Sequence, residues 1–341
     1  MLKKYLIIIL IFSALLTGCE KEKKLVTDST YMLGTYLQLS VWTSDEAKGK
    51  EMIEASFKRI QEIEGKMSVN IENSEISTVN NNAGLKPVEV SSDTAFVLNR
   101  AVYYAALTKG AYDPTIGTLV KLWGIGTDRE NVPTQKEIKS ALEHVNYNAV
   151  RFQEGNKVVL AEEGMLIDLG GIAKGFAADE VTRILRESGI EHAMINLGGN
   201  VYALGNKTDG TNWKVGIQDP FEPTGTHMGI VEIADKTVVS SGNYERYFMK
   251  DDIRYHHILD PKTGYPANNG VISTTIITDS SIDADALSTG AYVLGLEKGL
   301  ELIEKIDGTE CIIITEDKGV YLSSGMKGKL RIVNDSFYLA N

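Results

Sequence analysis

The second half of the chain is divided into many short apolar runs, and this pattern limits the fold more than any other feature. Strands are predicted at 193–197, 213–217, 228–233, 254–259, 271–278, 311–315 and 319–322, after a first strand at 31–42 and a hairpin feeding a strand at 150–168. Apolar residues three to four positions apart predict helices at 46–67, 91–107, 115–123, 172–188, 283–293 and 297–306. Because helices and strands do not alternate regularly, the pattern favours an α+β fold.

The N-terminus has the features of a signal peptide. Lys3 and Lys4 precede an apolar stretch at 5–16, which is too short to cross ~30 Å of hydrocarbon comfortably. The following Leu16-Thr17-Gly18-Cys19 resembles the bacterial lipobox. The resemblance implies a diacylglycerol on Cys19, cleavage before it, and a protein held by lipid on the extracytoplasmic face of the cell membrane. The alternative is a free cysteine that closes an ordinary signal peptide.

Three segments are therefore predicted: a lipoprotein signal peptide at 1–18, a tether at 19–29 whose charged start lacks apolar periodicity, and one large domain at 30–341. The other cysteine, Cys311, lies in an apolar run and is predicted to be a small buried residue on a strand. With Cys19 lipidated, no disulfide can form within the chain. The domain must therefore be held together by its hydrophobic core.

The net charge argues against two classes of partner. It is −11, and loss of Lys3 and Lys4 with the signal peptide would make it −13. An acidic chain is a poor ligand for nucleic acid. It is also a poor ligand for anionic lipid, so the lipid on Cys19 would have to provide the membrane attachment.

Several common motifs are absent. The segment 170–175 resembles a phosphate loop, but Lys174 precedes its last glycine and Phe176 stands where Ser or Thr is needed. The Rossmann glycine spacing, a zinc-binding Cys or His cluster, and the Gly-x-Ser-x-Gly turn of hydrolases are missing as well. The usual nucleotide-binding and hydrolase motifs therefore do not apply.

The segment 168–175 joins a predicted strand to a helix. Its glycines allow the backbone to approach a ligand closely, and free amides at a helix start favour anions. Lys174 adds a positive charge suited to phosphate. The alternative is a tight turn with a solvated lysine.

The segment 283–290 opens a predicted helix on which Asp285 and Thr289 are four positions apart, so both project from one face. A carboxylate beside a hydroxyl suits Mg²⁺, which prefers oxygen ligands. Asp283 is better explained by capping of the first turn. Capping is the alternative for Asp285 also.

Four further segments contain polar residues at predicted turns. His257 lies at a strand end, where a histidine can act as a base or contact phosphate. Asp113 precedes a helix and is placed either to cap it or to hold a polar edge of a ligand. The stretches 240–247 and 196–200 are turns that line a cleft or simply close hairpins.

Taken in order, these segments resemble the ApbE family of FAD:protein FMN transferases over essentially the whole chain after the tether. The matching stretches are Gly34-Thr35-Tyr36, Ser74 to Ser77, Tyr112 to Gly117 with Leu122-Trp123-Gly124, Asp168 to Gly175, Asn196 to Asn200, Ser240 to Arg246, His257 to Pro261 with Thr263-Gly264, and Ala284 to Gly290. The resemblance implies a single large, T-fold-like α+β catalytic unit.

The resemblance also implies a ligand set. Mg²⁺ would be held by Asp285 and Thr289, with the carbonyl of Gly171 and with Ser288 nearby. The residues implied to contact FAD are Leu33, Asn70, Ala111, Tyr112, Asp113, Asp168, Lys174, His257 and Leu259. Two positions depart from the family pattern: Leu33 stands where Met is usual, and Asn70 stands at a variable, often aromatic position.

The implied reaction transfers FMN from FAD to a Thr or Ser hydroxyl of an acceptor flavoprotein and releases AMP, with Mg²⁺ neutralising charge. His257 is the first candidate for the proton acceptor and Asp285 the second. Two alternatives use the same pocket. One is a Mg²⁺-dependent FAD pyrophosphatase with water as the nucleophile, and the other is a lipoprotein that binds FAD without catalysis.

Overall fold

The computed structural model describes residues 22–341, so the predicted signal peptide and Cys19 lie outside the described residues. The helices of the described part are α2 (Glu46–Met67), α3 (Glu75–Asn81), α4 (Ser92–Leu107), α5 (Gly117–Trp123), α6 (Gln135–Leu142), α7 (Ala173–Glu187), α8 (Ser281–Leu294) and α9 (Leu296–Ile303), with 3₁₀ turns at Tyr147–Ala149 and Ser324–Met326. Mixed helices and strands confirm the predicted α+β class.

A nine-stranded sheet forms the centre of the molecule, and its strand order is β1-β2-β6-β7-β10-β13-β14-β15-β17. These strands are β1 (Lys24–Met32), β2 (Thr35–Thr43), β6 (His192–Leu197), β7 (Asn200–Leu204), β10 (Lys236–Gly242), β13 (Val271–Thr278), β14 (Glu310–Thr315), β15 (Gly319–Leu322) and β17 (Tyr338–Leu339). Neighbouring strands are antiparallel except β15 and β17, which are parallel. The sheet therefore consists mostly of hairpins and longer antiparallel returns.

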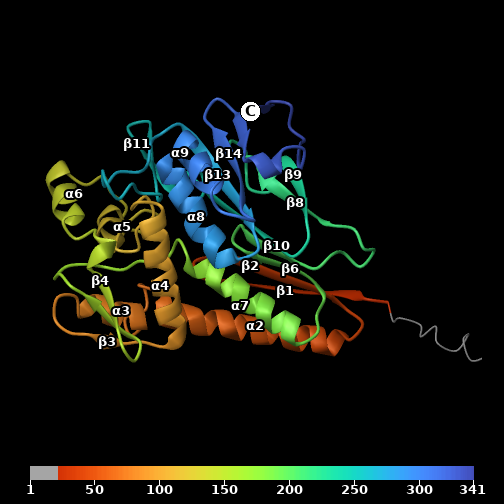
Figure 1. Ribbon diagram of the computed structural model, residues 1–341, viewed down its shortest axis with the longest axis horizontal. Helices are drawn as coiled ribbons and strands as arrows, with labels where there is room; N and C mark the ends of the chain where they lie inside the picture. The colour runs from red at the N-terminus through yellow and green to blue at the C-terminus, as the bar shows by residue number, and fades with distance from the viewer. Residues whose placement is uncertain (1–21) are drawn as a thin grey trace, which may run out of the picture.

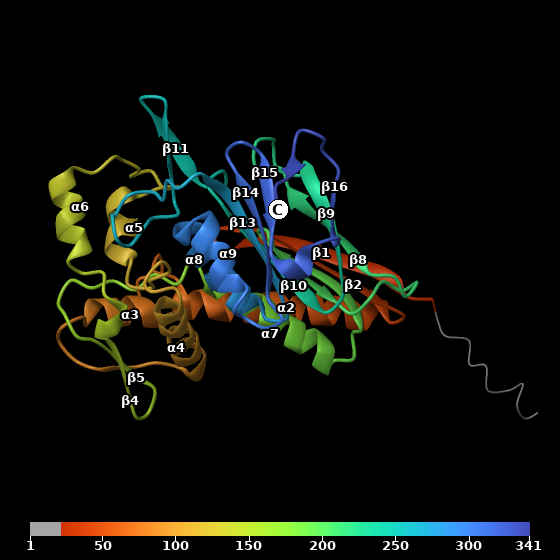
Figure 2. The ribbon, with the colours of Figure 1, turned by 45° about the horizontal axis from the view of Figure 1, so that its top comes forward.

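Helices cover one face of this sheet and a small sheet covers the other. Helices α2, α7, α8 and α9 pack on the first face (Figure 1). On the second face, β8 (Trp213–Gln218), β9 (His227–Ile233) and β16 (Leu330–Ile332) enclose a separate apolar cluster. A further sheet contains β3 (Val88–Glu89), β4 (Val150–Gln153) and β5 (Lys157–Leu160), and a projecting hairpin contains β11 (Tyr247–Lys250) and β12 (Ile253–His256) (Figure 2).

The predicted strand at 31–42 is wrong in one respect, because it is part of a hairpin. Strands β1 and β2 pair along their full length, and the turn between them is formed by Leu33 and Gly34, both with positive φ (53° and 68°). Glu64 of α2 accepts a hydrogen bond of 2.9 Å from the Leu33 amide and so helps to hold this turn. The predicted tether at 19–29 is also too long, since β1 begins at Lys24.

The structure gives the cap of one helix and corrects a capping prediction for another. Helix α4 is capped by Ser91, whose hydroxyl accepts from the Thr94 amide. Asp283 does not cap α8 but forms an ion pair with Arg100 of α4. The free amides at the start of α8 are instead satisfied by Asp179 of α7, which accepts from the amides of residues 281 and 282 at 2.8 and 2.9 Å.

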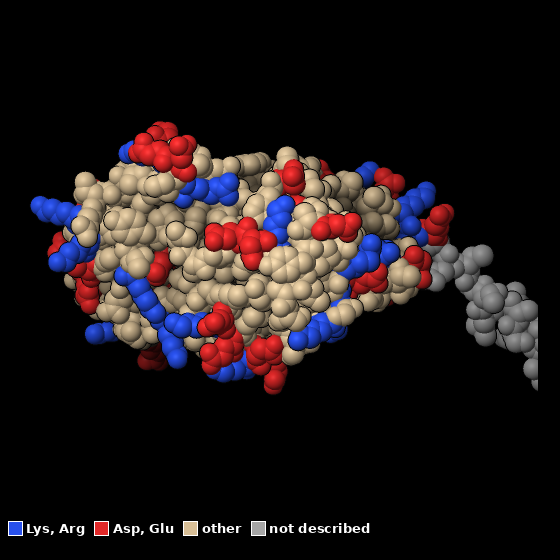
Figure 3. Space-filling view, turned by 90° about the horizontal axis from the view of Figure 1, so that it is seen from above, with Lys and Arg blue, Asp and Glu red and all other residues tan. Residues whose placement is uncertain are grey.

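No helix within residues 22–341 is long and apolar enough to cross a membrane. Cys311 is completely buried on β14, as predicted, and burial raises the pKa of its thiol to about 12. On the face drawn in Figure 3, acidic and basic side chains are interspersed over the surface of the described residues.

Candidate functional site

The site forms where the start of α7 meets α8. The two helices approach so closely at Gly175 that a Cβ there would lie 2.2 Å from the Ser281 carbonyl oxygen. The Gly175 amide donates a 3.0 Å hydrogen bond to Oδ2 of Asp285, which is only 3% exposed. Lys174 Nζ lies 3.6 Å from the other carboxylate oxygen and donates to the Gly170 carbonyl at 3.2 Å. The two segments singled out in the sequence are therefore one site.

Three hydroxyl groups cluster one turn further along α8. The Ser241 hydroxyl, at the end of β10, lies 2.8 Å from that of Ser288 and 3.4 Å from that of Thr289. Ser288 is completely buried and also donates to the backbone carbonyl of Asp285 at 2.9 Å. Helix α8 thus presents a carboxylate and two hydroxyls at one place, as the spacing in the sequence predicts for Asp285 and Thr289.

Tyr112 closes the site from a third direction. A Cβ at Gly171 would lie 3.2 Å from the Tyr112 ring and 3.4 Å from Oγ1 of Thr289, so these three residues are in contact. The Tyr112 hydroxyl is buried and has no hydrogen-bond partner among residues 22–341. Burial and the nearby carboxylates of Asp285 and Asp168 raise its pKa far above the ordinary value. A buried hydroxyl without a partner is a group that a bound ligand or water would satisfy.

The donors at this site fit Mg²⁺ bound together with a phosphorylated ligand. They are oxygen atoms: one carboxylate on Asp285, the hydroxyls of Ser288 and Thr289, and the carbonyl of the half-buried Gly171. Within the described part of the chain, no three His, Cys, Asp or Glu side chains form a metal-binding group. Because Mg²⁺ commonly keeps waters and takes substrate phosphates as ligands, a single carboxylate is enough for this chemistry.

Asp168 forms the turn that leads into α7. Its carboxylate accepts a 2.7 Å hydrogen bond from the Gly170 amide. Burial raises the pKa of Asp168, while that amide and the positive charges of Arg246 and Lys174 oppose the rise. The side chain therefore shapes the glycine turn and faces the same charged groups as the rest of the site.

His257 lies next to the cluster. Its amide and its Nδ1 lie 3.0 and 3.2 Å from the Arg246 carbonyl oxygen. Because a carbonyl only accepts hydrogen bonds, Nδ1 carries the hydrogen and the lone pair is on Nε2. Burial, with the positive charges of Arg246, His256 and Lys174, lowers the pKa of His257 to about 3. The imidazole is therefore neutral at physiological pH.

The neighbouring His256 is a structural residue. Its Nε2 donates to the Ala267 carbonyl at 3.0 Å, and its Nδ1 accepts from the Ile258 amide at 3.3 Å. The ring is 5% exposed, and burial lowers its pKa to about 4. Both nitrogens are occupied, so this histidine holds the loop that carries His257.

We expect this buried histidine to make the protein sensitive to acid. The ordinary histidine pKa is 6.5, and that of His256 in the folded protein is about 4. Between these pH values the unfolded chain therefore binds more protons than the folded protein. The free energy of unfolding consequently falls as the pH falls from 6.5 to 4. His256 should reduce the free energy of unfolding by roughly 3 kcal/mol between pH 7 and pH 4, and urea unfolding at the two pH values would measure this. The variant His256→Phe should be less stable than the wild type at pH 7. Between pH 7 and pH 4, however, its free energy of unfolding should fall by roughly 3 kcal/mol less than that of the wild type. Equal losses in both proteins would contradict this assignment.

Several of the residues predicted to contact FAD make contacts within the folded chain instead. Asp113 accepts hydrogen bonds from the Thr115 amide and hydroxyl and from the Tyr147 amide, so it neither caps α5 nor presents a free carboxylate. The side chain of Leu259 is buried in an apolar cluster with residues of α5 and α6. Ala111 is buried as well, so Ala111 and Leu259 would contact a ligand mainly through their backbone.

Leu33 and Asn70 lie outside the cluster around Asp285. Leu33 is half-buried in the turn between β1 and β2, whose Gly34 carbonyl accepts from Arg246. Asn70 is exposed on the loop after α2, and its amide donates to the Ser68 hydroxyl at 3.2 Å. The hydrogen bonds of the described residues do not connect Asn70 to the cluster around Asp285.

Three further site residues, Ser241, Glu245 and Arg246, were not predicted individually from the sequence. Their only signal in the sequence was the polar turn at 240–247, which was also explained as the end of a hairpin. Partial loss of solvent contact raises the pKa of the Glu245 carboxyl, while Lys174 and Arg246 oppose the rise and Asp285 adds to it; the residue as a whole is exposed. This turn therefore lies among the charged groups of the site.

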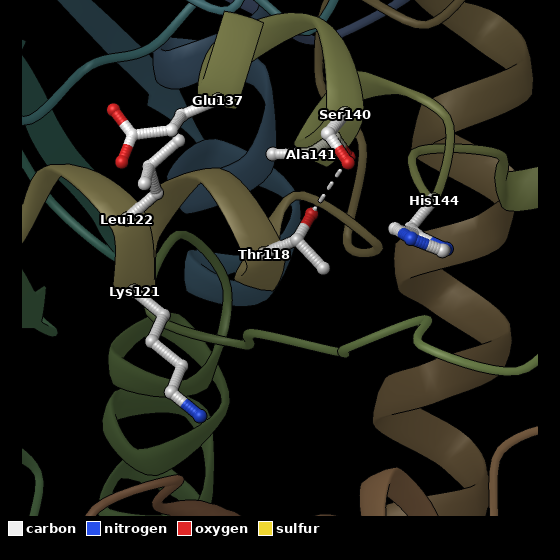
Figure 4. A pocket seen from close by; sticks show the side chains of 7 residues that line it. All are labelled: Thr118, Lys121, Leu122, Glu137, Ser140, Ala141 and His144. Carbon is white, nitrogen blue, oxygen red and sulfur yellow. Dashed lines mark hydrogen bonds between the residues drawn. The ribbon is translucent and has the colours of Figure 1, made fainter. Parts of the chain in front are cut away.

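A separate pocket of about 480 Å³ lies between α5 and α6 (Figure 4) and is lined by Thr118, Lys121, Leu122, Glu137, Ser140, Ala141 and His144. The Thr118 hydroxyl on α5 links the two helices by donating to the Ala141 carbonyl of α6 at 3.1 Å. The pocket contains none of the residues around Asp285, and the chemistry described above does not use it.

Known proteins resemble this chain over nearly its whole length. The FAD:protein FMN transferase of Treponema pallidum is 37% identical over 323 residues, which are 90% of this chain and 89% of that protein. The protein of the same name from Klebsiella pneumoniae is 35% identical and covers 89% of this chain and 93% of that protein.

Solved structures agree with these relatives. The ApbE protein of Thermotoga maritima superposes with a TM-score of 0.83 at 34% identity, over 90% of this chain and 99% of that chain. The flavin transferase ApbE of Vibrio cholerae gives a TM-score of 0.81 at 31% identity, over 89% and 99%. The ApbE family model matches residues 33–313, so this chain belongs to the ApbE family.

Proposed function

We propose that this protein transfers FMN from FAD to a Thr or Ser hydroxyl of an acceptor flavoprotein and releases AMP, in a Mg²⁺-dependent reaction. The observation that carries the proposal is the junction of α7 and α8. There the Asp285 carboxylate bonds to the Gly175 amide and lies beside Lys174, and the hydroxyls of Ser288 and Thr289 donate to the Asp285 backbone carbonyl on the same helix. Relatives covering about nine-tenths of the chain are named FAD:protein FMN transferases, which supports the same reaction.

In this reaction the acceptor oxygen forms a bond to the FMN-side phosphorus, and the bond from that phosphorus to the bridging oxygen breaks. AMP leaves with the bridging oxygen. Mg²⁺ held by Asp285, Thr289, Ser288 and the Gly171 carbonyl would supply positive charge where negative charge accumulates. Lys174 and the amides at the start of α7 favour the same phosphates.

His257 is the better of the two predicted proton acceptors. Its Nε2 lone pair is free of the bond made by Nδ1. Asp285 has one oxygen bonded to the Gly175 amide and the other beside Lys174, which suits a metal ligand more than a base. Positive charges nearby lower the pKa of His257. The phosphates of bound FAD would offset these charges and so raise the pKa of His257.

Mass spectrometry of an acceptor flavoprotein incubated with the enzyme, FAD and Mg²⁺, with and without EDTA, tests the proposal. A Mg²⁺-dependent gain of one FMN on a Thr or Ser is the expected result. Free FMN and AMP with an unmodified acceptor would instead indicate an FAD pyrophosphatase. Intact FAD with several flavoprotein acceptors would indicate a carrier of FAD.

We also propose that Cys19 carries the lipid that holds the protein on the extracytoplasmic face of the cell membrane. The support is the sequence Leu16-Thr17-Gly18-Cys19 after an apolar stretch. Fractionation of cells that express the wild type or Cys19→Ala tests this, since the wild type should be found in the membrane fraction as a lipidated mature chain. Identical fractionation and mature mass of the two proteins would overturn the lipid assignment.

A further inference from the structure

Arg246 lies where three separate segments meet at the site. Its Nη2 donates a 3.0 Å hydrogen bond to the carbonyl of Gly34 in the turn between β1 and β2. A Cβ at Gly126, in the loop after α5, would lie 3.6 Å from Cδ of Arg246, so this loop contacts the stem of the side chain. The backbone carbonyl of Arg246 accepts from the His257 amide. The Gly34 carbonyl and the Gly126 loop thus contact the side chain, which remains exposed at the surface of the site.

Only one of the donors of this guanidinium has a partner among the residues that the structure describes. Arginine has five N–H donors in a planar fork that matches the oxygens of a phosphate. The contact with the Gly34 carbonyl fixes the orientation of the group and leaves the other donors available. An oriented guanidinium with free donors beside a phosphate-transfer site is arranged to bind an anion.

The positive charge of Arg246 acts on the same groups as that of Lys174. Both charges oppose the rise in the pKa of Asp168 and of Glu245, and both add to the lowering of the pKa of His257. Lys174 comes from the start of α7 and Arg246 from the turn after β10, so two cations from different elements face one set of side chains.

We propose that Arg246 binds the pyrophosphate of FAD opposite Lys174 and so acts as a second cationic arm of the phosphate site. The inference rests on the proposed function for the identity of the ligand, and it adds a residue to the phosphate-binding set. It also explains why the Leu33–Gly34 turn approaches so closely: a Cβ at Gly34 would lie 3.3 Å from Arg246 Nη2. This turn therefore positions the guanidinium.

The test measures FAD binding by quenching of flavin fluorescence in Mg²⁺, without an acceptor, at several salt concentrations. Arg246→Gln should bind FAD about 10- to 100-fold more weakly, and its affinity should depend less on salt because one screened charge contact is lost. Arg246→Lys should keep the salt dependence and lose less affinity, since it keeps the charge but not the fork. Arg129→Gln, which removes an exposed arginine (77% side-chain exposure) from the neighbouring loop, should bind FAD as the wild type does.

Unchanged FAD affinity in Arg246→Gln would overturn the inference. So would a loss with unchanged salt dependence, because that result would mean that Arg246 only holds the Gly34 turn. The proposed function is judged separately: a wild-type protein that does not bind FAD contradicts the proposed function. Normal FAD binding by both the wild type and Arg246→Gln contradicts only the role of Arg246.

Discussion

Replacing Asp285 by Asn should reduce Mg²⁺-dependent FMN transfer by about 10³-fold or more, because the site has a single carboxylate for the metal. The substitution keeps the size of the side chain and leaves an oxygen to accept from the Gly175 amide. The fold should therefore survive, and circular dichroism would confirm this. The second expected result is that Mg²⁺ no longer increases the affinity for FAD, which a titration with and without EDTA would show.

Asp283→Asn is the matched control, since it removes a carboxylate two residues away on the same helix. Asp283 faces Arg100 and not the cluster around Gly175. We expect this variant to lose about 1 kcal/mol or less of stability, the usual value of a partly exposed ion pair, and to transfer FMN at the wild-type rate. If Asp285→Asn kept wild-type transfer in Mg²⁺, the assignment of Asp285 as the metal ligand would be wrong.

Replacing Gly175 by Ala should destabilise the protein by about 3 kcal/mol, the upper part of the usual range for overpacking. The added Cβ would lie 2.2 Å from the Ser281 carbonyl oxygen and 2.6 Å from the Ile282 Cα, and these are backbone atoms that cannot rotate away. Helices α7 and α8 would have to separate. In a domain of this size the thermal midpoint should fall by roughly 5 °C, which calorimetry would measure.

The rate of FMN transfer should also fall in the Gly175→Ala variant. The Gly175 amide that bonds to Asp285 would move with α7, so transfer should be impaired below the thermal midpoint as well. Gly65→Ala is the matched control, because a Cβ at that position of α2 has no neighbour within 4 Å. This exposed helical site should gain about 0.5–1 kcal/mol from the substitution. A Gly175→Ala protein as stable as the wild type would contradict the observed helix contact.

Much of the secondary structure follows from local patterns. The apolar spacing at 46–67 predicts the helix α2 with the same bounds, and the run at 271–278 predicts β13 in the same way. Of the hairpin at 24–43, only a strand at 31–42 was predicted, with the residues before it assigned to the tether. Nothing in the local pattern shows that Leu33 adopts a positive φ and turns the chain. A short helix such as α3 gives too few apolar repeats to be recognised.

The sequence by itself determined the α+β class, the pairing of Asp285 with Thr289 on one helical face, and the glycine turn that starts α7. These features depend on neighbours a few positions apart, and the helical or extended period fixes their geometry. Only the tertiary structure decided that Gly175 and Asp285, which are 110 positions apart, share a hydrogen bond. It likewise decided that Arg246 joins the site and that Asp113 does not present a free carboxylate. The physical reason is that contacts between distant segments come from the packing of whole elements, which no local period encodes.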